Sequence, residues 1–194
     1  YSEYWLQTFK RIDPHHEYLV ARETPAWVIE ELDLRHDRSQ NRVCFPVRDF
    51  NKTLVGLHGR AIKEGVQPKY RMYRGDDGTK PNSHIWYGEH WVDLDAPYVI
   101  VESVFDLARI FEITKQVICP LTASFGRFKA NRLNGSNEIY TIFDRDDAGR
   151  RARLNLENWV EDYVYMGHLE LPKENTDPSD YTADQMRILL DNLV

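Results

Sequence analysis

The stretch YTIFDRDDAG, residues 140–149, ends an apolar run with three carboxylates in four positions. Residues 138–143 read as a buried strand, because apolar and β-branched side chains dominate them. Asp144, Asp146 and Asp147 follow, with Arg145 between them. Like charges this close repel, and ionised carboxylates are seldom buried without a cationic partner. The stretch therefore predicts a loop at the end of a strand that is either solvated or occupied by a cation.

The sequence around this loop alternates between strand-like and helix-like segments. Three strand–helix pairs follow one another, at residues 98–114, 116–133 and 138–164. The strand of each pair is a short continuous apolar run, as in YVIVES at 98–103. Such alternation is typical of α/β proteins in which helices flank a parallel sheet. The second half of the chain is therefore expected to form a Rossmann-like parallel sheet flanked by helices.

The first half has a different pattern, which predicts a smaller α+β unit. Residues 1–38 are helical in pattern, and TPAWVIEELDL suggests a helix with Thr24 as its N-cap and Pro25 at its first position. Two β-like segments, 42–49 and 53–62, follow as an expected hairpin. We therefore expect two domains, a basic N-terminal subdomain over 1–95 and an α/β domain over 96–194.

Composition indicates an ordinary globular chain with an uneven charge distribution. Of its 194 residues 42% are hydrophobic, and the net charge is −6. No apolar run is long enough to cross a bilayer, and the first residues lack a signal-peptide profile, so a cytoplasmic protein without a membrane partner is expected. Residues 41–75 nevertheless carry eight Lys and Arg against two Asp and Glu. This window predicts either a phosphate-binding surface or a basic, solvated face.

The two cysteines argue against a disulfide or a zinc site. Cys44 and Cys119 both lie in apolar, strand-like runs, RVCFPV and QVICPL. Small buried thiols are typical of such positions, whereas a zinc site needs about four Cys or His ligands at short spacings. Two buried free thiols are therefore expected.

Acidic side chains end two of the predicted parallel strands. Glu102 ends the first strand, and Asp144 and Asp146 end the third. Ligands of such sheets bind at the carboxyl ends of the strands, so the three carboxylates are predicted to converge. Oxygen ligands without His or Cys suit Mg²⁺ or Mn²⁺. The alternative is structural: Asp144 would cap the following helix, and Asp146 and Asp147 would favour its dipole.

VIVES with Glu102 and FDRDDAG with Asp144 and Asp146 resemble the Toprim domain, in which a Glu ends one strand and Asp-x-Asp another. VESVFDLARI, LTASFGRF and ENTDPSDY are also similar to segments of the Toprim domain in bacterial and phage-type DNA primases. This resemblance implies three further metal-site carboxylates. They are Asp106, Asp177 and Asp180.

The resemblance continues upstream, from about residue 18. RVCFPVRDFNKTLVGLHGRAI and PKYRMY resemble the basic subdomain of DnaG-like primases, whose side chains line the template and nucleotide groove. The positions that match are Arg42, Arg48, Arg60, Lys69 and Tyr70. The pairing of this subdomain with Toprim separates primases from topoisomerases and Toprim nucleases.

The resemblance implies an RNA polymerase core that makes short RNA primers from ribonucleoside triphosphates on single-stranded DNA, using Mg²⁺ or Mn²⁺. It also implies a replicative helicase as partner and, for a phage-encoded member, the host cytoplasm as location. No counterpart of the family's zinc-binding domain is present, so the chain is expected to be the isolated core. Two alternatives remain open: a Toprim-type metal-dependent nuclease, and a non-catalytic module that binds single-stranded nucleic acid.

Overall fold

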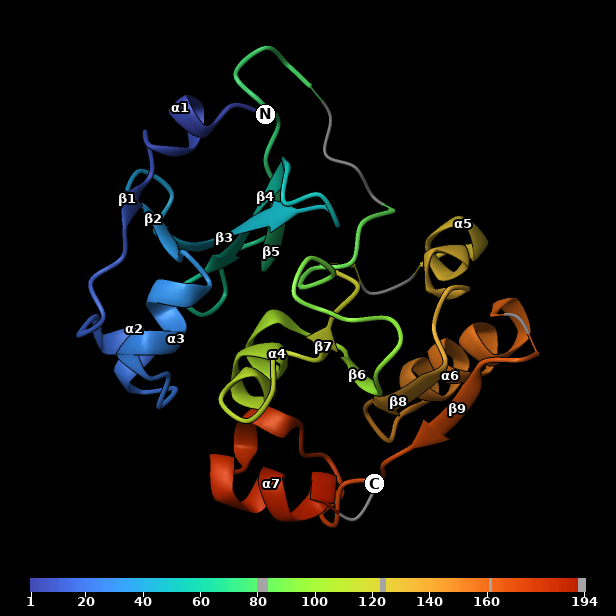
Figure 1. Ribbon diagram of the computed structural model, residues 1–194. Coiled ribbons are helices and arrows are strands. Elements are labelled where there is room, and N and C mark those ends of the chain that lie inside the picture. Colours follow the sequence, from blue (N-terminus) through green and yellow to red (C-terminus); the bar gives the residue numbers. More distant parts are fainter. Residues whose placement is uncertain (80–83, 123–124, 161, 192–194) are drawn as a thin grey trace. The chain divides into compact units, whose positions relative to one another are not determined.

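The computed structural model describes residues 1–79, 84–122, 125–160 and 162–191, and it divides into two compact units. The first unit is Tyr1–Asn82 and the second is Ser83–Val194. Residues 84–95, which were expected in the first domain, therefore belong to the second compact unit. Figure 1 labels the elements of both units.

The first unit is built on a five-stranded antiparallel sheet in the order β1-β2-β3-β4-β5. The strands are β1 (Lys10–Arg11), β2 (Arg35–Asp37), β3 (Arg42–Arg48), β4 (Leu54–Ala61) and β5 (Tyr70–Met72). The helices are α1 (Glu3–Leu6), α2 (Glu17–Val20) and α3 (Ala26–Glu31). The expected hairpin is present as β3 and β4. α3 begins one residue later than predicted, because Pro25 and not Thr24 occupies its N-cap position.

The central strand β3 contains a proline at a place where the sheet tolerates one. Pro46 pairs with Leu57 of β4, whereas the register of β2 reaches only Cys44. At Pro46 the strand therefore has a neighbour on one side only, which is where a residue without an N–H is accepted in a sheet. This arrangement lets a strand that is buried over residues 42–47 include a proline.

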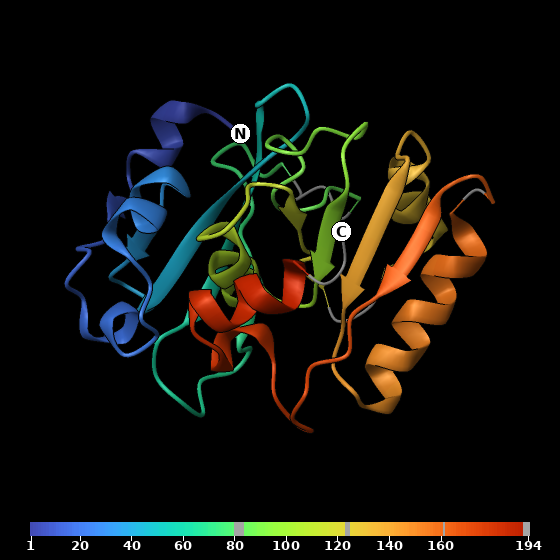
Figure 2. The ribbon, with the colours of Figure 1, turned by 60° about the horizontal axis from the view of Figure 1, so that its bottom comes forward.

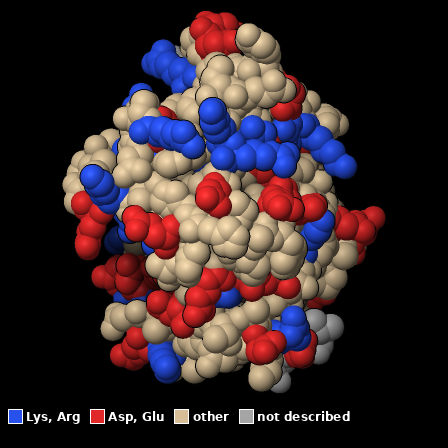
Figure 3. All heavy atoms as spheres, turned by 90° about the vertical axis from the view of Figure 1, so that its left-hand side faces the viewer, with Lys and Arg blue, Asp and Glu red and all other residues tan. Residues whose placement is uncertain are grey.

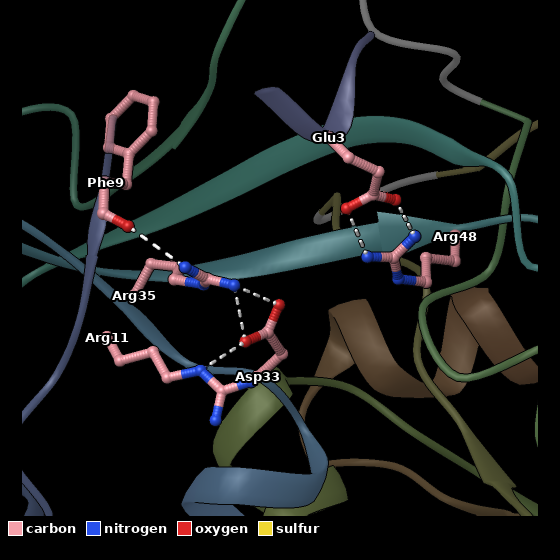
Figure 4. A network of polar contacts seen from close by, with 6 residues as sticks. All are labelled: Glu3, Phe9, Arg11, Asp33, Arg35 and Arg48. Carbon is pink, nitrogen blue, oxygen red and sulfur yellow. Dashed lines mark hydrogen bonds and ion pairs between the residues drawn. The ribbon is translucent and has the colours of Figure 1, made fainter. Parts of the chain in front are cut away.

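Apolar and polar contacts attach the N-terminal segment to the sheet of the first unit. The core cluster of Leu6, Cys44, Leu54, Leu57 and Tyr73 packs against Tyr1, Trp5 and Phe9. Figure 4 shows Asp33 between Arg35, whose Nη2 lies 2.7 Å from Oδ1, and Arg11, whose Nε lies 3.4 Å from the same oxygen. These contacts hold the residues that precede and follow the short helices α2 and α3.

The second unit contains a four-stranded parallel sheet in the order β7-β6-β8-β9. The strands are β6 (Tyr98–Val101), β7 (Val117–Ile118), β8 (Glu138–Ile142) and β9 (Tyr165–His168). Figure 2 shows the arrows of β6, β8 and β9 pointing the same way. This sheet is the parallel α/β architecture expected from the sequence, with one strand, β9, that was not expected.

Helices cover this sheet and complete its core. They are α4 (Val104–Phe111), α5 (Arg127–Ala130), η1 (Asn131–Leu133), α6 (Asp147–Trp159), η2 (Pro178–Asp180) and α7 (Ala183–Asp191). Tyr98 and Ile100 of β6 and Ile139 of β8 pack with Leu156 of α6. Every residue of α4 is buried, because η2 and α7 pack against this helix as well as β7.

Both cysteines are free and buried, as expected, and burial raises the pKa of each thiol to about 12. Among the described residues no helix has the length and apolar character that a membrane crossing requires. Figure 3 shows Lys and Arg side chains gathered in a band on one face, with Asp and Glu side chains on both sides of that band.

Candidate metal and nucleic-acid site

The ends of β6 and β8 meet at the residues predicted to converge. The two strands are parallel neighbours, with Val101 opposite Ile142. Glu102 follows β6 directly, and its Oε1 accepts a hydrogen bond from the backbone N–H of Asp144, with an N···O distance of 2.6 Å. The carboxylate of Glu102 therefore lies beside the loop that carries Asp144 and Asp146.

Asp146 caps the helix that follows this loop. Its side chain is the N-cap of α6, where Oδ1 accepts from the backbone N–H groups of Ala148 at 2.9 Å and Gly149 at 2.8 Å. The structural alternative had assigned this cap to Asp144, and the structure assigns it to Asp146. One carboxylate oxygen of Asp146 is thus engaged by the helix, while the Asp144 side chain is exposed.

Gly149 allows the first turn of α6 to approach both strand ends. A Cβ at this position would lie 2.1 Å from the carbonyl oxygen of Asp144 and 2.9 Å from Oε1 of Glu102. Since real Cβ atoms do not come so close to a backbone atom, only glycine fits here without a shift of the chain. The glycine therefore helps to keep Glu102 and Asp144 next to each other.

Asp106 lies beneath this cluster in the first turn of α4. It forms a capping box with Ser103, whose backbone N–H donates to Oδ2 of Asp106 at 3.0 Å. Asp106 is only 3% exposed, and no donor among the described residues reaches its buried Oδ1. A buried carboxylate oxygen without a donor is costly unless it is protonated or a cation is bound near it.

Asp177 and Asp180 come to the same place through the packing of η2 on α4. Asp177 caps η2 and accepts from the backbone N–H of Ser179 at 2.9 Å, while Asp180 accepts from the backbone N–H of Asp177 at 3.1 Å. The two residues therefore form a reciprocal capping box. The structure thus brings together all six acidic residues named from the sequence, and we call them the acidic cluster.

Burial and the neighbouring negative charges raise the pKa of three carboxyls in the acidic cluster. Burial, followed by the charges of Asp144, Asp146 and Asp177, raises the pKa of Glu102 to about 7. Burial and the neighbouring Asp177 raise the pKa of Asp106 well above its ordinary value. Asp144 is more open to solvent, and the partial covering of its carboxyl together with the charge of Asp177 raises its pKa as well. Each shift means that the ionised cluster lacks positive charge.

The acidic cluster has the oxygen ligands that a hard divalent cation prefers, but these ligands are not arranged as a complete coordination shell. Within the described ranges, no three His, Cys, Asp or Glu side chains form a group that could hold a metal ion. Mg²⁺, however, is commonly bound by one or two carboxylates together with water and substrate phosphates. The all-oxygen donor set, the raised pKa values and the donorless Oδ1 of Asp106 are all compatible with such an ion.

In the first unit, two of the five predicted groove residues, Arg60 and Lys69, lie around the ring of a third, Tyr70. Arg60 pairs with Tyr70 across β4 and β5, and its Nη1 donates to the Tyr70 hydroxyl at 2.6 Å. The Nζ of Lys69 lies 6.0 Å from the ring centroid, and the ring of His58 stacks on Tyr70 at a centroid distance of 5.2 Å. Tyr70 therefore has one aromatic neighbour already and remains partly exposed.

Arg42 supports this cluster from inside the fold. Its side chain is 3% exposed, and its guanidinium donates to the backbone carbonyls of Pro68 at 2.8 Å and Lys69 at 3.3 Å. The contact fixes the backbone that carries Lys69. Arg42 thus lies with the groove residues, but its donors are directed at the protein backbone.

Arg48 lies at the other end of β3, about 20 Å along the strand from Arg42. Its guanidinium forms a two-fold ion pair with Glu3, at 2.5 and 3.0 Å (Figure 4). It also donates to the carbonyl of Lys52 at 3.1 Å. The structure therefore does not bring Arg48 together with Arg60 and Lys69.

A cavity of about 380 Å³ adjoins these residues, and part of its lining was not predicted from the sequence. Arg60 and Lys69 line it together with Tyr18, Arg22 and Lys63. The guanidinium of Arg22 lies over the ring of Tyr18, 4.9 Å from its centroid. Their spacing of four residues in YLVAR is the signal that could have revealed them, because side chains four apart share a helix face. The similar turn LTASFGRF includes residues 123 and 124, which lie outside the described residues.

Comparisons with known proteins agree with this arrangement. No protein-family model matches the chain. The DNA primase of Aquifex aeolicus is 28% identical over 194 residues, which cover 94% of this chain and 37% of that primase. The chain thus spans less than two-fifths of the length of this relative.

Solved structures show the same fold. The crystal structure of the zinc-binding and RNA polymerase domains of the Aquifex aeolicus primase has a TM-score of 0.75 and 22% identity, over 91% of this chain and 55% of that one. The DnaG primase catalytic domain bound to single-stranded DNA has a TM-score of 0.71 and 17% identity, over 91% of this chain and 70% of that one. The expected fold class is therefore confirmed. By sequence and by fold, the chain is related to the catalytic core of bacterial-type, DnaG-like DNA primases.

Proposed function

We propose that the chain is the RNA polymerase core of a DNA primase, which joins ribonucleoside triphosphates into short RNA primers on a single-stranded DNA template. The relationship to a curated primase extends over 94% of the chain. A DnaG catalytic domain of the same fold has been solved with single-stranded DNA bound, which supports this kind of template. A replicative helicase as partner stays a prediction from the resemblance.

The acidic cluster is the proposed catalytic centre. Glu102, Asp144 and Asp146 would hold Mg²⁺ or Mn²⁺, and Asp106, Asp177 and Asp180 would add negative charge around the ion. Such an ion, when bound, lowers the pKa of the attacking 3′-hydroxyl and neutralises charge on the α-phosphate and the leaving pyrophosphate. The protein's own part is positional, since the N–H of Asp144 holds the Glu102 carboxylate and Asp146 anchors the loop to α6.

The cationic residues around Tyr70, Arg60 and Lys69, are the proposed binders of template and nucleotide phosphates. Arg60 and Lys69 would contact phosphate oxygens, which are bound without regard to sequence. Arg22 shares their cavity and is added to the proposal. Arg42 would act through the backbone of Lys69. Tyr70 would stack on a base or ribose, and Arg48 stays a predicted template contact.

The observation that carries the proposal is the hydrogen bond from Asp144 to Glu102, which joins two strand ends inside a cluster of six acids. The test is a primer assay with labelled ribonucleotides, single-stranded template and Mg²⁺ or Mn²⁺. We expect short oligomers from the wild type and none above background from Glu102→Gln or Asp144→Asn. Asp147→Asn is the matched control, because Asp147 follows this loop directly, as the first residue of α6, but pairs with Arg150.

The same assay separates the alternatives. Metal-dependent cutting of DNA without added triphosphates would indicate a Toprim-type nuclease. Salt-sensitive binding of single strands with neither synthesis nor cutting would indicate a binding module. Oligomer yields unchanged by both Glu102→Gln and Asp144→Asn would contradict the assignment of the catalytic centre.

A further inference from the structure

A second hollow lies in the second unit, at the carboxyl ends of β8 and β9, and we call it the strand-end hollow. Its volume is about 320 Å³, room for roughly ten water molecules at about 30 Å³ each. Three arginines line it, Arg145 from the loop after β8 and Arg150 and Arg153 from α6. Asp144 belongs to the same lining, so the hollow adjoins the acidic cluster.

Two of the three arginines, Arg145 and Arg153, have loose ion pairs, whereas Arg150 pairs closely with Asp147. Nη2 of Arg145 lies 3.8 Å from both Glu170 and Glu174, which is beyond hydrogen-bond distance. The Nε of Arg153 is buried and has no hydrogen-bond acceptor among the described residues, and its nearest carboxylate oxygen, on Glu157, is 3.9 Å away. Two guanidinium groups can therefore accept a better anion without losing a strong bond.

Glu157, the nearest carboxylate to Arg153, is bound to His168. The two ring nitrogens of His168 lie 2.6 Å from Oε1 of Glu157 and 2.5 Å from the hydroxyl of Thr141. This chain of contacts fixes one wall of the hollow. Because Glu157 is committed to the imidazole, it is a poor partner for Arg153, which leaves that guanidinium available to a ligand.

We propose that the strand-end hollow binds a polyphosphate group, two or more linked phosphates held by Arg145, Arg150 and Arg153. Guanidinium groups suit this ligand, because their forked N–H donors bind phosphate oxygens in pairs. The group has two possible sources, pyrophosphate released by the reaction and the triphosphate of a nucleotide. Naming these sources rests on the proposed primase function, whereas the binding itself does not.

Two carboxylates in the same lining repel a phosphate ligand, and this repulsion provides a further test of the proposal. Glu170 and Glu174 line the hollow, and their side chains are 67% and 77% exposed, so they can turn away into solvent. They compete with an incoming phosphate for Arg145. Removing their charges should therefore tighten polyphosphate binding, which an unspecific loss of structure would not do.

The experiment is calorimetric titration of pyrophosphate into the whole chain without a divalent metal. Arg145→Gln and Arg153→Gln should each weaken binding about ten-fold or more, as expected for one charge-assisted contact. Arg151→Gln is the matched control on the same helix, because Arg151 does not line the hollow, and it should change affinity less than about two-fold. The double variant Glu170→Gln/Glu174→Gln should bind more tightly than the wild type.

Pyrophosphate has a second candidate binding place in the cavity of the first unit, which is lined by Arg22, Arg60 and Lys69. Each titration is therefore repeated in a protein that also carries Lys69→Gln. Equal weakening of pyrophosphate and ATP by the arginine variants would indicate the triphosphate tail as source, and weakening of pyrophosphate alone would indicate the product. The proposal is overturned if pyrophosphate does not bind at millimolar concentration, or if Arg145→Gln and Arg153→Gln bind it like Arg151→Gln. Neither result depends on primer synthesis, so failure of this proposal and failure of the proposed function are distinguishable.

Discussion

The carboxylate of Glu102 accepts the backbone N–H of Asp144 at 2.6 Å, although 42 residues separate them in the sequence. The bond is possible because β6 and β8 are adjacent and parallel, so both residues leave the same edge of the sheet. It fixes the loop after β8 against the end of β6. Residues that support this contact should therefore matter to stability and to activity together.

Gly149→Ala should destabilise the protein by about 1–3 kcal/mol, because the new methyl group would collide with the carbonyl of Asp144. The shift that relieves this clash should also move Glu102 and lower primer synthesis. Urea unfolding measures the first effect. Gly126→Ala is the control, since its Cβ would meet nothing within 4 Å. Equal stability of the two variants would contradict the proposed close approach.

Lys129 should contribute stability that rises with pH in the alkaline range. The residue is 2% exposed, and burial lowers its pKa from 10.5 to about 8. Between about pH 8 and 10 Lys129 is therefore protonated more often in the unfolded chain than in the folded chain, so its own contribution to the free energy of unfolding increases with pH. Below pH 8 both states are protonated, and the cost of burying the charge is present in full. The buried thiols of Cys44 and Cys119, whose pKa burial raises, contribute in the opposite direction above about pH 8.5, where free thiols ionise.

Urea unfolding at several pH values checks this prediction, with Lys129→Met as the comparison. The stability of the wild type relative to this variant should rise between pH 8 and 10, because the methionine side chain cannot titrate and the thiols contribute equally to both proteins. Buried tyrosines such as Tyr98, whose pKa burial raises, lower stability only when free tyrosine ionises, near pH 10. A difference in stability between the wild type and Lys129→Met that stays constant from pH 7 to 10 would contradict the assignment.

Lys69→Ala and Arg60→Ala should weaken binding of single-stranded DNA and reduce its dependence on salt. Each lost phosphate contact lowers the slope of log K against log salt by about 0.7 for single strands. Fluorescence anisotropy at several salt concentrations measures the slope. Lys10→Ala is the control, an exposed cation of the same unit that does not line the cavity. If the salt dependence is unchanged in both variants, Arg60 and Lys69 do not contact the phosphates of single-stranded DNA.

Arg48 and Glu3 should be coupled in stability. An ion pair of this exposure is worth about 0.2–1 kcal/mol, so a double-mutant cycle with Arg48→Ala and Glu3→Ala should give a coupling energy in that range. The same variants test the predicted template contact of Arg48. If that contact exists, Arg48→Ala weakens DNA binding and Glu3→Ala does not; if both leave affinity unchanged, Arg48 serves the fold alone.

Long-range features of the second unit were predictable from local pattern. The buried runs that end in Glu102 and Asp144 indicated parallel strands, and parallel strands place their carboxyl ends at one edge. The strand β9 was missed, because YMGH is short, contains Gly167 and lies on the edge of the sheet. It is specified by pairing with β8, which no local pattern reports.

The tasks of individual polar side chains were less predictable. Asp144, Asp146 and Asp147 are alike in sequence, and only the phase of α6 decides that Asp146 is the cap. Arg42 is similar to its basic neighbours, yet strand pairing directs it into the fold, where it is 3% exposed. Side-chain direction in three dimensions separates groove residues from supporting residues, and composition does not contain it.

The central claim is that the ends of β6 and β8 bind one divalent ion between them. Anomalous diffraction from crystals soaked in Mn²⁺ tests it most directly. The account predicts a manganese peak beside the carboxylates of Glu102 and Asp144, and loss of that peak in Asp144→Asn, which keeps the backbone N–H that holds Glu102. No peak at this edge of the sheet at saturating Mn²⁺, or a peak unchanged by both Asp144→Asn and Glu102→Gln, would contradict it.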